Sequence, residues 1–351
     1  MAQNVTIYGI VDMGYHNEKS KFADGADSFT LKRQGLNSVV AGSRIGLRGT
    51  EDLGGGLKAG FVLEYAITPD ENAGIGTGAS PNRQSFVSLG GGFGEIRLGR
   101  QLTLHHVNQG AGDLLGNLNA QAGYIGGLDS LVRASNAITY TSPAFNGFTV
   151  AAQKAFGETR INSEDANEKL NEQTAVRLSY AAGPLAAGFA TETTKNWDVA
   201  QQTAASADAT VFVGLGHLLN DTDVDARVPA FTVDKRRANN LFATYNFGVA
   251  QVGFVNNNTK FTTDGESVKW TANTLTVAVP MGATTLHASI GNGKVKVADE
   301  PNMKARAYQL GAQYAFSKRT SAYFYTGQSK FSVEDTSAKY NTYSVGVRHN
   351  F

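Results

Sequence analysis

Five arginines lie on predicted β-strands or at their ends, on the face of the strand opposite to its apolar side chains. They are Arg44, Arg48, Arg83, Arg97 and Arg133. Arginine keeps its charge at physiological pH and is weakly hydrated, so several arginines in a narrow passage create a lasting positive potential. Rings of such residues favour anions over cations. The alternative is a structural role, in which they pair with Glu51, Asp52, Glu64 or Glu95.

The segments that would carry these arginines alternate between apolar and polar residues. Between residues 57 and 65, large apolar side chains alternate with Lys58 and Glu64. A period of two is typical of strands with one face in an apolar environment and the other in water. The same alternation ends the chain and predicts the strand that closes a barrel, with apolar side chains at Tyr343, Val345, Val347 and Phe351.

Sixteen segments of roughly ten residues show this pattern between turn residues. The predicted strands are residues 5–15, 38–50, 57–67, 82–89, 94–100, 134–142, 147–156, 173–182, 185–194, 238–247, 249–258, 269–279, 283–291, 305–316, 320–330 and 341–351.

Every second connection is brief, whereas the others are long and polar. The long connections are residues 16–37, 68–81, 101–133, 157–172, 195–237, 259–268, 292–304 and 331–340. Short turns on one rim and long loops on the other are typical of outer-membrane barrels, and a soluble two-sheet protein would not separate them so consistently. The sequence therefore predicts an all-β fold: a single domain over residues 1–351, forming a 16-stranded antiparallel transmembrane β-barrel with short periplasmic turns and long extracellular loops.

Composition narrows the possible classes of protein. The chain has no cysteine, which excludes disulfides and thiolate metal sites. Its net charge of +1 gives no overall positive potential that would attract nucleic acid. There is no run of about 18 apolar residues, so a transmembrane helix is not predicted. The chain enters a strand pattern directly after Met1, without the features of a signal peptide, and we expect a mature secreted form.

A barrel of this size needs something inside it. Strands about 4.8 Å apart and tilted by about 40° would enclose a space about 30 Å wide, which inward side chains cannot fill. Residues 101–133 are the best candidate for an inserted third loop, because they carry enough apolar side chains to pack against a wall. Residues 195–237 are longer but more polar, and are predicted to form an extracellular loop or vestibule.

The inserted loop has few acids to oppose the arginines. Its charged and titratable residues include Asp113, Asp129, His105 and His106. Three wall arginines (Arg44, Arg83 and Arg133) against two carboxylates leave an excess of positive charge. The two histidines could ligate a metal, but adjacent histidines in one loop are usually only polar, so no metal site is predicted.

Four stretches together resemble general porins of the Gram-negative outer membrane, of the beta-proteobacterial type. They are SRIGLRGTEDLGGGLKA at 43–59, NRQSF at 82–86, GFGEIRLGR at 92–100 and VGVRHNF at 345–351. The resemblance implies a trimer, a third loop folded into the lumen and a basic wall cluster that maps onto Arg44, Arg83 and Arg133. It also implies that the last strand is read by the outer-membrane assembly machinery. The acidic loop tip of many porins is replaced here by Gly112–Gly116, which favours anion preference.

The leading hypothesis is an outer-membrane porin for passive diffusion of small hydrophilic solutes and ions, with weak anion selectivity. A substrate-specific channel for phosphate or small carboxylates is the alternative, and an outer-membrane enzyme a remote one. No histidine has an obvious catalytic partner, so neither enzymatic activity nor a cofactor is predicted. The expected partners are two further copies of the chain, outer-membrane lipid or lipopolysaccharide, the assembly machinery and small solutes, but not nucleic acid.

Overall fold

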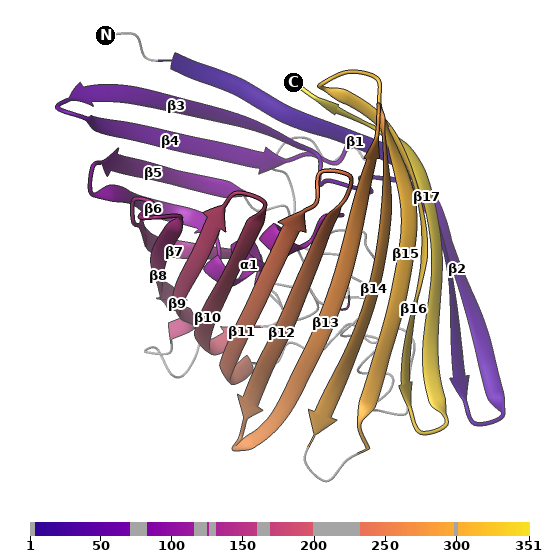
Figure 1. Ribbon diagram of the computed structural model, residues 1–351. Coiled ribbons are helices and arrows are strands. Elements are labelled where there is room, and N and C mark those ends of the chain that lie inside the picture. Colours follow the sequence, from indigo (N-terminus) through magenta and orange to yellow (C-terminus); the bar gives the residue numbers. More distant parts are fainter. Residues whose placement is uncertain are drawn as a thin grey trace.

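The computed structural model describes residues 4–70, 83–115, 125, 131–159, 169–198, 232–297 and 301–351. Its strands all belong to one sheet. Figure 1 shows them tilted and side by side, with helix α1 (Leu104–Gly112) inside the wall that they form and both termini at the same rim. Within these ranges, no helix has the length and apolar character needed to cross a membrane.

The strands are long, and neighbours in sequence pair with one another. They are β1 (Asn4–Asp24), β2 (Asp27–Asn37), β3 (Arg44–Gly54), β4 (Leu57–Ala66), β5 (Gln84–Gly91), β6 (Gly94–Leu102), β7 (Arg133–Thr141), β8 (Phe148–Thr159), β9 (Lys169–Ala182), β10 (Leu185–Asp198), β11 (Thr232–Asn246), β12 (Gln251–Thr263), β13 (Glu266–Met281), β14 (Thr284–Val297), β15 (Met303–Ala315), β16 (Thr320–Val333) and β17 (Thr336–Asn350).

The sheet closes on itself at β1. One edge of β1 pairs with β17 from Ile10 to Asp24. The other edge pairs with β3 near the N-terminus and with β2 further along, so β2 and β3 share a single place in the ring. The closed ring thus runs from β1 through β3 to β17, which confirms the predicted 16-stranded antiparallel barrel. Closure leaves no strand edge in the hydrocarbon, where an unpaired backbone group would cost several kcal/mol.

Side chains alternate across this wall as predicted. On β15, Tyr308 and Leu310 are about half exposed on the outer face, whereas Ala305 and Ala307 are buried. Aromatic side chains gather on the outer face near the rim of short turns, where interfacial girdles form; they include Phe93, Tyr140, Phe148, Tyr180, Tyr245, Phe247, Tyr314 and Phe316. The four apolar residues of the closing strand are also exposed: Tyr343, Val345, Val347 and Phe351.

On the rim of long loops, the strands extend further than predicted. Residues 27–37, expected to be loop, form β2, and β10 and β11 reach Asp198 and Thr232 instead of residues 194 and 238. The prediction followed apolar alternation, which stops where the wall leaves the hydrocarbon. Backbone pairing continues beyond that point with polar residues on the outer face.

A buried carboxylate fixes the seam between β1 and β3. Asp12 accepts hydrogen bonds from the backbone N–H groups of Val39 (3.1 Å), Val40 (3.0 Å) and Ala41 (2.8 Å). The hydroxyl of Tyr323 on β16 donates a further bond of 2.6 Å to the same carboxylate, which is fully buried. These bonds hold the connection between β2 and β3 against β1, and so determine where β3 begins.

Replacing Asp12 by alanine should destabilise the barrel, because three buried N–H groups lose their acceptor. We expect a loss of about 3 kcal/mol or more, measured as a lower midpoint of thermal unfolding in detergent. Tyr323→Phe removes one donor and leaves the three backbone bonds in place, so it should cost about 1 kcal/mol. Equal midpoints for Asp12→Ala and the unmodified chain would contradict this role.

Candidate functional site

The inserted loop begins with α1, and its two ends are tied together. The hydroxyl of Thr103 caps the helix by accepting a bond from the backbone N–H of His106 (3.1 Å). The same hydroxyl donates to the carbonyl oxygen of Leu131 at 2.5 Å. A threonine is favoured at this position because its oxygen satisfies an N–H group that the first turn leaves free. The described ends of the loop are thus anchored just inside the wall.

Polar side chains dock α1 against the far wall, on β9, β10 and β11. The amide nitrogen of Asn108 donates to the side chain of Asn240 (2.8 Å) and to the carbonyl of Gly188 (3.2 Å). Arg177 donates to the oxygen of Asn108 at 3.0 Å, and Asn240 donates to the carbonyl of His105 at 2.8 Å. Because Asn108 and Asn240 are buried, these bonds fix the orientation of the helix.

The end of α1 comes close to the wall because two glycines meet there. A Cβ atom on Gly253 would lie 2.4 Å from the carbonyl oxygen of Gly112, and one on Gly112 would lie 2.5 Å from Cγ2 of Val255. Beyond the helix, Leu115 packs with Tyr323 and Tyr325 of β16. The described part of the loop therefore follows the inner wall on the side of β9 to β12 and reaches β16.

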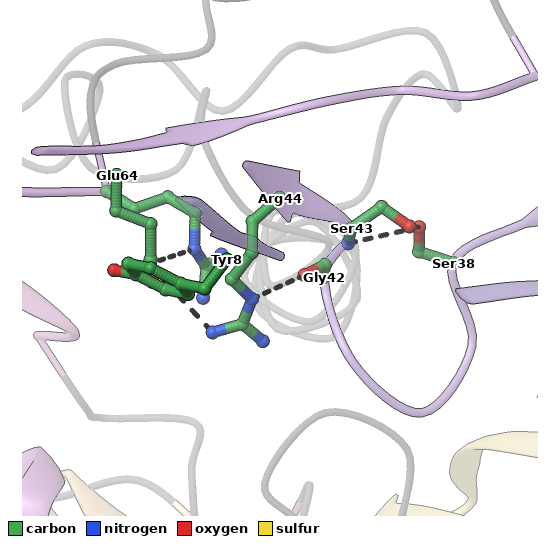
Figure 2. Close-up of polar contacts among 7 residues, drawn as sticks. Tyr8, Ser38, Gly42, Ser43, Arg44 and Glu64 are labelled. Carbon is green, nitrogen blue, oxygen red and sulfur yellow. Dashed lines mark hydrogen bonds and ion pairs between the residues drawn. The ribbon is translucent and has the colours of Figure 1, made fainter. Parts of the chain in front are cut away.

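The basic residues lie on β3 and β4 and on the segments beside them, and Figure 2 shows Arg44 next to Glu64 and Tyr8. Glu64 on β4 is nearly buried and accepts from Nε of Arg83 at 2.7 Å. Nη1 of Arg44 lies 3.9 Å from the same oxygen, and the hydroxyl of Tyr8 donates to the other oxygen at 3.1 Å. Arg44 also donates from Nε to the carbonyl of Gly42 at 3.0 Å. Glu64 thus orients two of the predicted arginines.

Two further arginines join this basic wall. Arg133, at the start of β7, is near enough to Arg83, Arg100 and Arg44 to be repelled by all three, and Glu64 is the acid that attracts it. Arg100 donates from Nη1 to the hydroxyl of Ser135 at 2.7 Å. Within the described residues, Arg83, Arg44 and Arg133 therefore lie near Glu64 and Arg100 lies next to Arg133, so this part of the wall has more arginines than carboxylates.

Arg48 and Arg97 lie nearer the rim of short turns than this group. The guanidinium of Arg48 stacks over the ring of Tyr8, 5.2 Å from its centroid, nearer the short-turn rim. Arg97 forms a 2.7 Å ion pair with Glu95 and stacks over Phe86. The pairing with an acid that was considered from sequence is therefore present at Arg97, through Glu95, as well as at Arg83 and Arg44, through Glu64.

The four titratable loop residues named from the sequence lie in different parts of the barrel interior or outside the described residues. Asp113 accepts a bond from the backbone N–H of Leu115 (3.0 Å) and acts electrostatically on Tyr325, so it lies on the β16 side. His106 lies beside Arg133 and Arg83. His105 is fully buried between α1 and the wall near Arg236 and does not reach the lumen. Asp129 lies outside the described residues.

The environment of both histidines keeps them uncharged. Burial, together with the positive charges of Arg133 and Arg83, lowers the pKa of His106 to about 4. Burial and the nearby Arg236 lower the pKa of His105 well below its usual value. Desolvation and a neighbouring cation both disfavour imidazolium. The positive potential of this region is therefore carried by arginines alone.

Sequence reasoning missed Arg100, Arg177 and Tyr8 as members of the site. Arg100 lies next to an irregularity in the pairing of β6 with β7, which breaks the simple alternation used to assign faces. Arg177 lies on the inner face of β9, and its link to Asn108 joins residues 69 positions apart. From the sequence, Glu64 was considered only as a possible partner of the arginines, although it lies on the water-facing side of a predicted strand.

A closed antiparallel barrel with a docked inner loop and a charged wall defines a transmembrane channel of the outer-membrane type. The family model described as Gram-negative porin matches residues 1–334. The chain belongs to this family, which confirms both the resemblance and the predicted location in the Gram-negative outer membrane.

Individual relatives agree with this assignment over nearly the whole chain. Outer membrane porin protein 32 of Delftia acidovorans is 35% identical over 341 residues, covering 92% of this chain and 83% of that protein. An outer membrane porin protein of Bordetella pertussis is 30% identical, and the match covers 99% of this chain and 94% of that protein. The solved structure of an anion-selective porin from Comamonas acidovorans is 29% identical, with a TM-score of 0.76 and full coverage of both chains.

Replacing Glu64 by glutamine should increase preference for anions, because it removes the carboxylate that Arg83, Arg44 and Arg133 share. The ratio of chloride to potassium permeability should rise about twofold to threefold, as expected for one charge several ångströms away in water. Reversal potentials in a salt gradient across planar bilayers measure this ratio. Glu95→Gln removes the same charge next to the short turn between β5 and β6, away from the basic wall, and as the matched control it should change the ratio less. An unchanged ratio for Glu64→Gln would contradict the arrangement.

His106→Gln should leave ion selectivity unchanged at pH 7.5 and at pH 5.5. With a pKa of about 4, His106 is neutral at both values, whereas an ordinary histidine would be mostly charged at the lower one. The measurement is the reversal potential of the unmodified and substituted channels at each pH. A titration step near pH 6.5 that disappears in His106→Gln would show that the imidazole does carry charge.

Proposed function

We propose that this porin is a weakly anion-selective channel for passive diffusion of small hydrophilic solutes. The observation that carries the proposal is the imbalance at the basic wall, where Arg44, Arg83 and Arg133 lie near Glu64 and Arg100 lies next to Arg133. Fixed positive charge in a narrow aqueous passage raises the local concentration of anions and lowers that of cations.

The loop side supports the same sign of selectivity. The sequence of α1 contains no acidic residue, and Asp113 is engaged near Leu115 and Tyr325, away from Glu64. Because the loop is docked through Asn108 and Asn240, it provides a fixed surface opposite the arginines. An anion passing between the two surfaces meets arginines on one side and, on the other, a helix without acidic residues beside Arg177.

Glu64 explains why the selectivity should be weak. It already engages Arg83 and Arg44, so an anion competes with a carboxylate for their N–H groups. A site that attracts an ion but does not hold it permits diffusion, whereas a set of free arginines would bind anions and slow their passage. A general channel fits this geometry better than a tightly binding one.

Comparisons support the proposal. The solved porin from Comamonas acidovorans is described as anion-selective and covers the whole of this chain. An outer membrane protein of Vibrio cholerae with the same fold is described in a trimer form. We infer that this chain also forms a homotrimer, and that the outward alternation of Tyr343, Val345, Val347 and Phe351 is the feature read by the assembly machinery.

Replacing Arg83 and Arg133 together by glutamine should reduce preference for anions about fivefold, because two charges are removed from the narrow passage. Chloride-to-potassium permeability ratios in planar bilayers provide the test, and the effect should shrink at high salt. Arg97→Gln is the control, since Arg97 lies near the short turn between β5 and β6 and away from the basic wall.

If the double variant keeps the chloride-to-potassium permeability ratio of the unmodified channel, Arg83 and Arg133 have a structural role only. A clear preference of the unmodified channel for potassium would overturn the proposed selectivity, whatever the variants do.

A further inference from the structure

A tyrosine reaches the carboxylate of the basic wall across the strand that lies between them. Tyr8 on β1, Gly46 on β3 and Glu64 on β4 lie opposite one another in register, with Gly46 in the middle. Neighbouring strands are about 4.8 Å apart, so about 10 Å separates the backbones of Tyr8 and Glu64. The hydroxyl of Tyr8 nevertheless lies 3.1 Å from Oε2 of Glu64, and Figure 2 shows the two side chains next to each other.

Gly46 makes this reach possible. A Cβ atom on Gly46 would lie 2.5 Å from Cζ of Tyr8 and 2.7 Å from its hydroxyl oxygen. Any side chain at this position would therefore take the space that the aromatic ring now fills. The ring lies across the glycine, against the inner wall, and does not project into the lumen.

The hydroxyl of Tyr8 completes the set of donors around Glu64. Oε1 accepts from Nε of Arg83 at 2.7 Å, and Nη1 of Arg44 lies 3.9 Å from the same oxygen. Oε2 accepts from Tyr8, and the side chain of Glu64 is only 6% exposed. Because the hydroxyl is a neutral donor, it satisfies the second oxygen without adding charge. Without it, this oxygen would take its partner from the passage, as water or a cation.

The ring of Tyr8 also supports a cation. The guanidinium carbon of Arg48 lies 5.2 Å from the ring centroid. Arg48 is two residues beyond Gly46 on the same face of β3, is exposed, and forms no ion pair with another of the described residues. A ring face attracts a guanidinium while leaving its N–H edge free for an anion. Tyr8 therefore contacts both the carboxylate of the basic wall and a cation nearer the short-turn rim.

A similar contact on the outer face of β3 lacks the polar part. Gly49 lies opposite Phe61 of β4, and a Cβ atom on Gly49 would lie 2.4 Å from Cε1 of that ring. Gly49 shares its face of the strand with Leu47, which is exposed on the outside of the barrel. An aromatic ring over a glycine is thus a packing contact on both faces, and only on the inner face does it bring a hydroxyl to a carboxylate.

We infer that Tyr8, seated on Gly46, is a positioning residue for ion selectivity, an inference that rests on the proposed function. Its hydroxyl holds Glu64 against the wall, where the carboxylate moderates the charge of the arginines but does not bind passing cations. Its ring keeps Arg48 at the wall as a further positive group along the path of the anion. The absence of a side chain at Gly46 is what keeps the ring out of that path.

The test measures reversal potential and single-channel conductance in planar bilayers for Tyr8→Phe and Gly46→Ala. Tyr8→Phe should lower the ratio of chloride to potassium permeability about 1.5-fold to twofold. Its conductance should change little, because the ring and Arg48 remain in place. Gly46→Ala should lower both the ratio and the conductance, because the new methyl group displaces the ring into the lumen. Gly49→Ala is the matched control: it displaces Phe61 on the outer face and should change neither.

A double variant separates positioning from packing. Tyr8→Phe combined with Glu64→Gln should have the ratio of Glu64→Gln alone, since no carboxylate is left for the hydroxyl to hold. An unchanged ratio in Tyr8→Phe, or an equal shift with and without Glu64→Gln, would overturn the inference even if Gly46→Ala failed to fold. An unmodified channel that prefers potassium would overturn the proposed selectivity instead, and Tyr8→Phe should then still shift the ratio further toward potassium.

Discussion

The whole structure depends on one constraint: within the bilayer, every backbone N–H and C=O group must be paired inside the protein. A sheet satisfies this constraint only by closing, and β1 closes this one by pairing with β17 on one edge and with β2 and β3 on the other. The carboxylate of Asp12 completes the seam, because it satisfies the N–H groups of residues 39–41, which pair with no strand.

Closure at this circumference leaves an interior that wall side chains cannot fill, and the inserted loop follows from that. Its helix is held by buried amides, notably Asn108 and Asn240, together with the packing of Leu104 against Ala151 and Ala175. Such bonds are directional, so they fix the position of the loop as well as its presence. The described part of the loop is therefore bound to the wall at β9, β10 and β11.

The period of two along each strand separates two sets of cations with different environments. Arginines on the inner face converge on Glu64, where planar guanidinium groups share one carboxylate. Cations on the outer face, most of them lysines, meet one another across neighbouring strands just above the apolar band. The inner set acts on ions in water and the outer set faces the membrane surface, although both follow from the same alternation.

Local patterning in the sequence determined the barrel, its number of strands, its two unlike rims and the loop that enters it, because a two-residue period and turn residues are local properties. It also identified Arg44, Arg83 and Arg133. Only the tertiary structure decided that Arg100 joins them, that Glu64 sits at their centre, that Arg97 is balanced by Glu95 and that His105 is buried. Those outcomes depend on contacts between residues far apart in the chain, such as Arg177 with Asn108, and on strand register, which a single irregularity near Arg100 can change.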